Sequence, residues 1–177
     1  MAGFVQRMVG AARLDVRTYE EVEADRGATG QALGVVLLSA VAAGIGGLGT
    51  EGAEGPLMAA VGALAGWFLW AGLVYLVGVK LLPEPQTQAD FGQLLRTIGF
   101  SASPGILRLF GFIPILGALV GAVASVWMLI AMVIAVRQAL DYRSTARAIA
   151  VCVLGFVVYA GVVLVVGLLV GRAPWSF

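Results

Sequence analysis

Four stretches of this chain run without a charged side chain for longer than a helix needs to cross a membrane. They are residues 27–50, 55–79, 109–136 and 148–171. Each exceeds the ~20 apolar residues that span a hydrocarbon core of ~30 Å as an α-helix. Apolar residues make up 60% of the chain and charged ones 12%, against about 25% charged in a soluble domain. The sequence therefore predicts an all-α integral membrane protein with four secure spans.

Residues 90–108 form a fifth, shorter candidate span. Asp90 and Gln93 have the spacing of a capping box, which opens a helix. From Asp90 to Arg108 such a helix rises about 27 Å, and the long side chain of Arg96 can reach back to the interface. The uncharged part, residues 97–107, is short enough for a re-entrant segment, which is the alternative. We predict a bundle of five transmembrane helices, four secure and one short.

The basic residues favour five spans over four. Of the eleven Lys and Arg residues, a five-span chain with a cytosolic N-terminus leaves only Arg108 and Arg172 outside. A four-span chain instead places three outside, at 137, 143 and 147. Because basic residues concentrate in short cytoplasmic loops, we expect the N-terminus in the cytosol and the C-terminus outside. Residues 1–27 are then a cytosolic segment and residues 28–177 the transmembrane domain.

The N-terminal segment carries apolar side chains at helical spacing beside basic ones. Its charges interrupt any run that could serve as the apolar core of a signal peptide. An interfacial amphipathic helix on anionic lipid and a solvated lead-in are weighed equally. The candidate contacts to lipid or to a protein partner are the basic residues of this segment and of the last loop, Arg7, Arg13, Arg17, Arg143 and Arg147.

Several kinds of chemistry lack the residues they require. The chain has no histidine, and its one cysteine is Cys152, which excludes disulfide frameworks, Cys/His metal sites and His-based catalysis. The four secure spans hold no acidic residue, although ion-coupled transporters usually need one near the midplane. We expect no catalytic, cofactor-binding or metal-binding residue, and no nucleic-acid partner.

Polar residues in the short span are the other candidate site. Arg96, Ser101, Ser103 and Pro104 either line a polar pocket or hinge, or mark a simple kink, because proline frees a backbone carbonyl. Small residues four apart allow close helix packing. They are Gly62 with Gly66, Gly117 with Gly121 and Ser125, and Gly167 with Gly171. We favour packing inside one bundle over a subunit interface, so a homo-oligomer is not the preferred state.

Several short segments resemble bacterial Yip-type membrane proteins. They are residues 14–22 (LDVRTYEEV), 30–33 (GQAL), 95–104 (LRTIGFSASP), 133–140 (VIAVRQAL) and 144–148 (STARA). The resemblance implies a five-span domain with a cytosolic N-terminus in a bacterial cytoplasmic membrane. The eukaryotic relatives interact with Rab-type GTPases and take part in vesicle traffic and membrane shaping. This chain has no acidic-Leu-Tyr-Gly-Pro motif, so the resemblance does not carry GTPase binding over.

Two hypotheses of function follow. The favoured one is a non-enzymatic membrane scaffold or organiser that recruits a cytosolic protein or arranges membrane lipids. The alternative is a small transporter or channel, or the membrane subunit of a larger transport assembly. The transporter requires a continuous polar cavity that reaches Arg96 or Ser103, whereas the scaffold predicts a closed, dry bundle.

Overall fold

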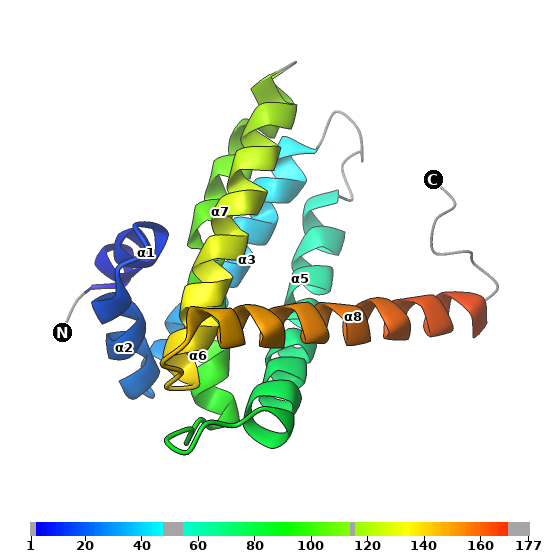
Figure 1. Ribbon diagram of the computed structural model, residues 1–177. Helices are drawn as coiled ribbons and strands as arrows, with labels where there is room; N and C mark the ends of the chain where they lie inside the picture. The colour runs from blue at the N-terminus through cyan, green and yellow to red at the C-terminus, as the bar shows by residue number, and fades with distance from the viewer. Residues whose placement is uncertain (1–2, 48–54, 114–115, 170–177) are drawn as a thin grey trace.

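The computed structural model describes residues 3–47, 55–113 and 116–169, and every element within them is helical (Figure 1). In chain order the helices are α1 (Phe4–Ala12), α2 (Val16–Ala24), α3 (Ala28–Gly46), α5 (Gly55–Val74), the π-helix η1 (Tyr75–Leu81), α6 (Phe91–Ser101), the 3₁₀-helix η2 (Ser103–Phe112), α7 (Leu116–Ala139) and α8 (Thr145–Leu169). Four stretches are long and apolar enough to cross a membrane, in α3, in α5 with η1, in α7 and in α8. The prediction of an all-α membrane protein is confirmed.

The short span that the sequence predicts, the third along the chain, corresponds to α6 and η2 together. Neither is long enough alone, but the pair follows α3 from one end to the other. Gly99 lies against Ala32, Gly105 against Ser39, and Gly111 against Gly46. The predicted capping box of Asp90 and Gln93 opens α6. The pair thus accompanies the 19 residues of α3, about 28 Å of helix, and the count of five spans rests on this pairing.

Pro104 lies where the short span changes from α-helix to 3₁₀-helix. It stands in the first turn of η2, where a missing backbone N–H does no harm. Hydroxyl groups satisfy two carbonyls just before it. Ser101 Oγ donates to Ile98 O and Ser103 Oγ donates to Phe100 O, both at 2.7 Å. The two serines thus accompany a change of helix type.

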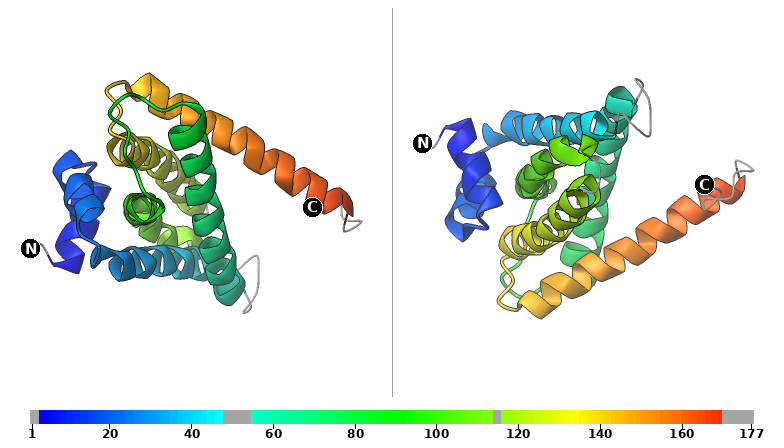
Figure 2. Two further views of the ribbon diagram at one scale, coloured as in Figure 1. Left: turned by 90° about the horizontal axis from the view of Figure 1, so that it is seen from below. Right: turned by 90° about the horizontal axis from the view of Figure 1, so that it is seen from above.

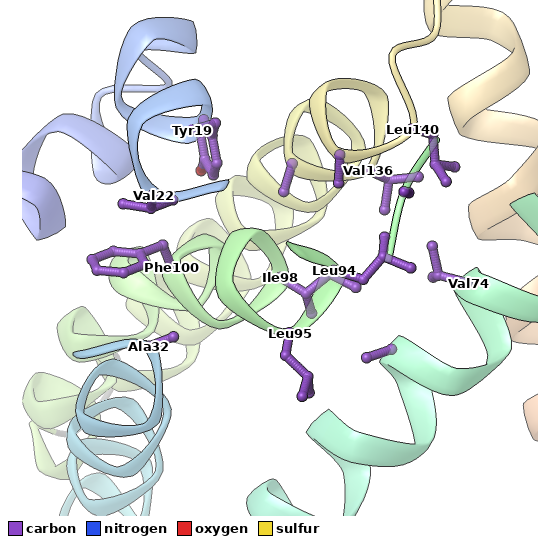
Figure 3. Close-up of a cluster of buried hydrophobic side chains, with 14 of the residues drawn as sticks. Tyr19, Val22, Ala32, Val74, Leu94, Leu95, Ile98, Phe100, Val136 and Leu140 are labelled. Atoms are coloured by element: carbon purple, nitrogen blue, oxygen red, sulfur yellow. The ribbon is translucent and has the colours of Figure 1, made fainter. Parts of the chain in front are cut away.

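The hydrophobic core is built around α6, the central element of the bundle (Figures 2 and 3). All residues from Leu94 to Ser101 are buried. Figure 3 shows Tyr19 and Val22 of α2, Ala32 of α3, Val74 of α5 and Val136 of α7 around this helix, and all belong to one buried cluster. The N-terminal helix pair therefore shares the core of the spans.

A π-helical turn ends the second crossing. Tyr142, which follows α7, shares its single O–H between two carbonyls, with its hydroxyl oxygen 2.9 Å from Gly78 O and 2.6 Å from Leu82 O. A Cβ on Gly78 would lie 2.4 Å from Leu140 Cδ1, so the chain after α7 packs directly on this turn. π-helical turns are rare, and here the Tyr142 hydroxyl supplies a hydrogen bond to carbonyls at both Gly78 and Leu82. The π-helix ends at Leu81, two residues before Pro83.

The last helix, α8, leaves the bundle at a wide angle (Figures 1 and 2). Near its start Val151 is buried, and Gly155 lies against the Trp70 ring. Further along, Phe156 is 63% exposed and Leu168 is exposed as well. A helix that is apolar on all sides needs lipid or protein around it. The expected outside position of the C-terminus lies beyond the described residues.

Most of the small residues singled out in the sequence do not lie where two helices approach closely. A Cβ added at Gly62, Gly66 or Gly121 would meet nothing within 4 Å, whereas one at Gly117 would lie 2.1 Å from Gly111 O. Of the predicted stripe, only Gly117 is therefore at a close approach. The pair Gly167 and Gly171 extends outside the described residues.

Candidate functional site

The first two helices form a hairpin beside the bundle (Figure 1). Asp15 caps α2, because its Oδ1 accepts a hydrogen bond from the backbone N–H of Arg17 at 3.1 Å. The sequence also contains a Thr18–Glu21 capping-box pattern, but α2 begins before it and Thr18 is buried within the helix. A Cβ on Gly10 would lie 2.2 Å from Thr18 Oγ1, so the two helices are in close contact.

Arg7 links this hairpin to the bundle through ion pairs and a hydrogen bond. Its side chain is only 2% exposed. Its Nη2 lies 2.8 Å from Glu21 Oε1 and 2.7 Å from Asp25 Oδ2, and its Nη1 donates to Gln31 Oε1 at 3.1 Å. Hydrogen bonding by Arg7 lowers the pKa of the Asp25 carboxyl. Since Gln31 belongs to α3, the cluster joins both hairpin helices to the first span and turns Arg7 inward.

Arg96 caps the C-terminal end of α2. Its Nε lies 3.0 Å from Val22 O and 3.1 Å from Glu23 O, and its Nη2 also donates to Glu23 O. A cation at a helix C-terminus satisfies carbonyls that have no partner within the helix. Arg96 is itself buried. Its guanidinium thus joins the C-terminal end of α2 to α6.

Glu23 is held in a half-buried position at the same contact. It accepts a hydrogen bond from Gln93 Nε2 at 3.2 Å. Burial raises the pKa of Glu23 to about 7, and the charge of Asp141 adds to the shift, while Arg96 opposes it. Glu20 and Asp90 add smaller repulsions. An unperturbed glutamate titrates near 4.3, so this carboxyl binds a proton more tightly when the hairpin is docked.

Docking of the hairpin is therefore expected to weaken as the pH rises. Because the docked state binds the Glu23 proton more tightly, stability falls between pH ~4.3 and ~7 and is level above that. Asp25, whose pKa is lowered, stays ionised across this range and keeps its bond to Arg7. Hydrogen exchange of the α2 amides should be slower at pH 5.5 than at pH 8, once corrected for intrinsic rates. Glu23→Gln should abolish the difference, and a difference that survives in this variant would assign it to another group.

The outer side of the hairpin carries exposed apolar and cationic residues together. Val5 is 66% exposed and Val9 is exposed as well, while Arg13 and Arg17 are exposed near the turn of the hairpin. Phe4 and Met8 of the same helix pack on the core instead. The outer surface of the hairpin, defined by these exposed valines and arginines, is what a helix at a lipid interface requires.

The hairpin also reaches far along α7. Trp127 Nε1 donates to Ala12 O at 2.7 Å, and Leu14 shares a shallow apolar hollow with Val126 and Ile130. Trp127 is 12 residues before Ala139, the last residue of α7, which corresponds to about 18 Å of helix. The turn between α1 and α2 therefore lies against the middle of a membrane-spanning helix.

The basic residues of the last loop form a separate group. Arg147 Nε lies 3.5 Å from Glu84 Oε1, and the backbone N–H of Arg143 donates to Glu84 Oε2 at 3.2 Å. Both arginine side chains are exposed. Of the five predicted lipid or partner contacts, Arg13 and Arg17 lie on the hairpin, and Arg143 and Arg147 lie on the loop. Arg7 is buried between the hairpin and α3.

The four polar candidates of the short span do not converge on one site. Arg96 contacts α2, Ser103 and Pro104 face α1 across a shallow hollow, and Ser101 lines a different cavity of about 370 Å³. That cavity is mainly apolar and Arg96 does not line it, so it is not a polar path to Arg96. Sequence reasoning missed Gln31 and Trp127, since a polar group within an apolar span shows no sign of its distant partner.

Fold and site together define a polytopic α-helical membrane protein in which a short N-terminal hairpin is docked on the spans. The model of the Yip1 domain family matches residues 15–166. The chain belongs to the Yip1 domain family. The match begins at the cap of α2 and ends at residue 166, within α8. Neither a curated protein nor a solved structure matches the chain.

Proposed function

We propose that this protein is a non-enzymatic membrane organiser that gathers anionic lipids around its N-terminal hairpin. One observation carries the proposal: the docked hairpin presents Arg13 and Arg17 beside exposed valines, against the middle of α7. We place the hairpin on the cytosolic side, in a bacterial cytoplasmic membrane, as the charge distribution and the family resemblance favour.

The physical basis is the depth at which these charges lie. A guanidinium beside the middle of a span cannot remain in hydrocarbon without a large cost, which snorkelling and local thinning of the bilayer reduce. Anionic headgroups drawn toward Arg13 and Arg17 would both neutralise them and thin one leaflet. Because Arg7 fixes the hairpin on α3, the deformation is imposed on the lipid and not absorbed by movement of the helices.

Replacing Arg13 and Arg17 together by Gln is expected to abolish lipid clustering. In phosphatidylcholine vesicles that contain pyrene-labelled phosphatidylglycerol, the parent protein should raise the excimer-to-monomer ratio. Each arginine near an anionic surface contributes about fivefold in lipid affinity, so the double variant should lose up to about 25-fold. Arg26→Gln is the matched control, since Arg26 is exposed but lies at the opposite end of α2.

The same preparation separates the competing functions. An excimer ratio that is unchanged in the double variant contradicts lipid organisation by the hairpin. Recovery of a cytosolic protein that requires Arg143 and Arg147 would instead favour the recruiting scaffold. Saturable solute flux that Arg96→Ala abolishes, with no partner recovered, would favour the transporter or a subunit of a transport assembly.

A further inference from the structure

A cavity of about 370 Å³ opens inside the bundle, between α3, α5, α6 with η2, and α7. Its volume lies within the roughly 300–1,000 Å³ of ordinary ligand sites. Most of its wall is apolar, and alanines of α3 and α5 (Ala40, Ala43, Ala59 and Ala63) leave it room. At one end Trp70 Nε1 lies 3.2 Å from Met132 Sδ, which joins α5 to α7 there.

A cationic side chain lies at the other end of this cavity. Arg108 lines it, close to the last turn of α3, because a Cβ on Gly46 would touch Arg108 O. Its Nη2 donates to Ser125 Oγ at 2.9 Å. Among residues 3–47, 55–113 and 116–169, no carboxylate forms an ion pair with Arg108. The guanidinium has five N–H donors, so most of them are free for an anion.

We propose that this cavity binds an anionic membrane lipid, with its headgroup on Arg108 and one acyl chain along the apolar wall toward Trp70. The lining agrees with this occupant, since Arg108 supplies charge and most of the other lining residues are apolar. The site lies at the end of the bundle away from the Arg7 cluster. It is therefore independent of the function proposed for the hairpin.

Trp67 and Trp70 line the cavity and report directly on its occupancy. With Trp127 and Trp175 replaced by Phe, they are the only tryptophans left of the four. This parent variant is placed in phosphatidylcholine nanodiscs with either dibrominated phosphatidylglycerol or dibrominated phosphatidylcholine at equal mole fraction. We expect phosphatidylglycerol to quench at about fivefold lower mole fraction, the preference that one arginine provides.

Substitutions at Arg108 test this preference, and substitutions on α5 test whether the lipid occupies the cavity. Arg108→Gln should remove it, while Arg108→Lys, which keeps the charge, should retain it. Gly66→Leu should lower quenching by filling the cavity, because Gly66 lines it and a Cβ there meets nothing within 4 Å. Gly62→Leu is the matched control, one turn earlier on α5, equally open and outside the cavity wall.

The outcomes either support or overturn the site. Equal quenching by the two lipids, or a preference that Arg108→Gln leaves unchanged, overturns it. So does the absence of quenching together with dimers that cross-link through α8, because a second copy would then occupy the cavity. If Arg108→Gln does not fold, Arg108→Lys and Gly66→Leu decide. Replacing Arg13 and Arg17 by Gln should leave the preference intact, which keeps this site distinct from the hairpin.

Discussion

Replacing Arg96 by Met is expected to lower the free energy of unfolding by about 3 kcal/mol, the value of one or two hydrogen bonds made by a charged group. Methionine keeps an apolar stem of similar length but leaves Val22 O and Glu23 O without their donors. Unfolding in mixed micelles of increasing dodecyl sulfate fraction, followed by circular dichroism, measures the loss. Hydrogen exchange should show that the α2 amides become the least protected.

Arg26→Met serves as the control for this substitution. It removes the same charge from an exposed position two residues beyond α2, where surface changes have small effects. If Arg96→Met proved as stable as the parent, the cap on α2 would contribute nothing. Arg96 would then be available to a solute, which would restore the transporter as the better hypothesis.

The spans could be predicted because a membrane demands length and apolarity, both of which are written locally in the sequence. The helix types within them could not. The π-turn depends on Tyr142, which reaches Gly78 O from 64 residues away. The 3₁₀-helix η2, which contains Pro104, belongs to the short span formed with α6. The uncharged run that begins at residue 109 predicts instead that residues 109–112 belong to the next span, which in the structure is α7. Such features depend on tertiary partners that periodicity does not contain.

The candidate site was predictable in its charges but not in its partners. Charge patterning singles out Arg13 and Arg17 as candidate contacts to lipid or a partner, and both are exposed in the structure. The same patterning grouped Arg7 with them, because nothing local shows that Glu21, Asp25 and Gln31, up to 24 residues distant, would surround it. A buried arginine and an exposed one look alike in sequence, and only the positions of the acids in space separate them.

Gly46→Ala is expected to destabilise the protein by about 3 kcal/mol, at the upper end of what overpacking costs. The new Cβ would lie 2.0 Å from Arg108 O and 3.3 Å from Gly111 Cα. Both are backbone atoms, so no side-chain rotation can relieve the contact, and η2 must move away from α3. The same titration with dodecyl sulfate measures the effect.

Gly62→Ala is the control, because the same type of substitution at this position is not expected to destabilise the protein. Its Cβ would meet nothing within 4 Å, and alanine in a helix interior is about 0.5–1 kcal/mol better than glycine, so this variant should match or exceed the parent. If Gly46→Ala behaved the same way, α3 and η2 would not touch at their far ends. The segment 91–112 would then stop short of α3, and the chain would cross the membrane four times with a re-entrant helix in place of the fifth span.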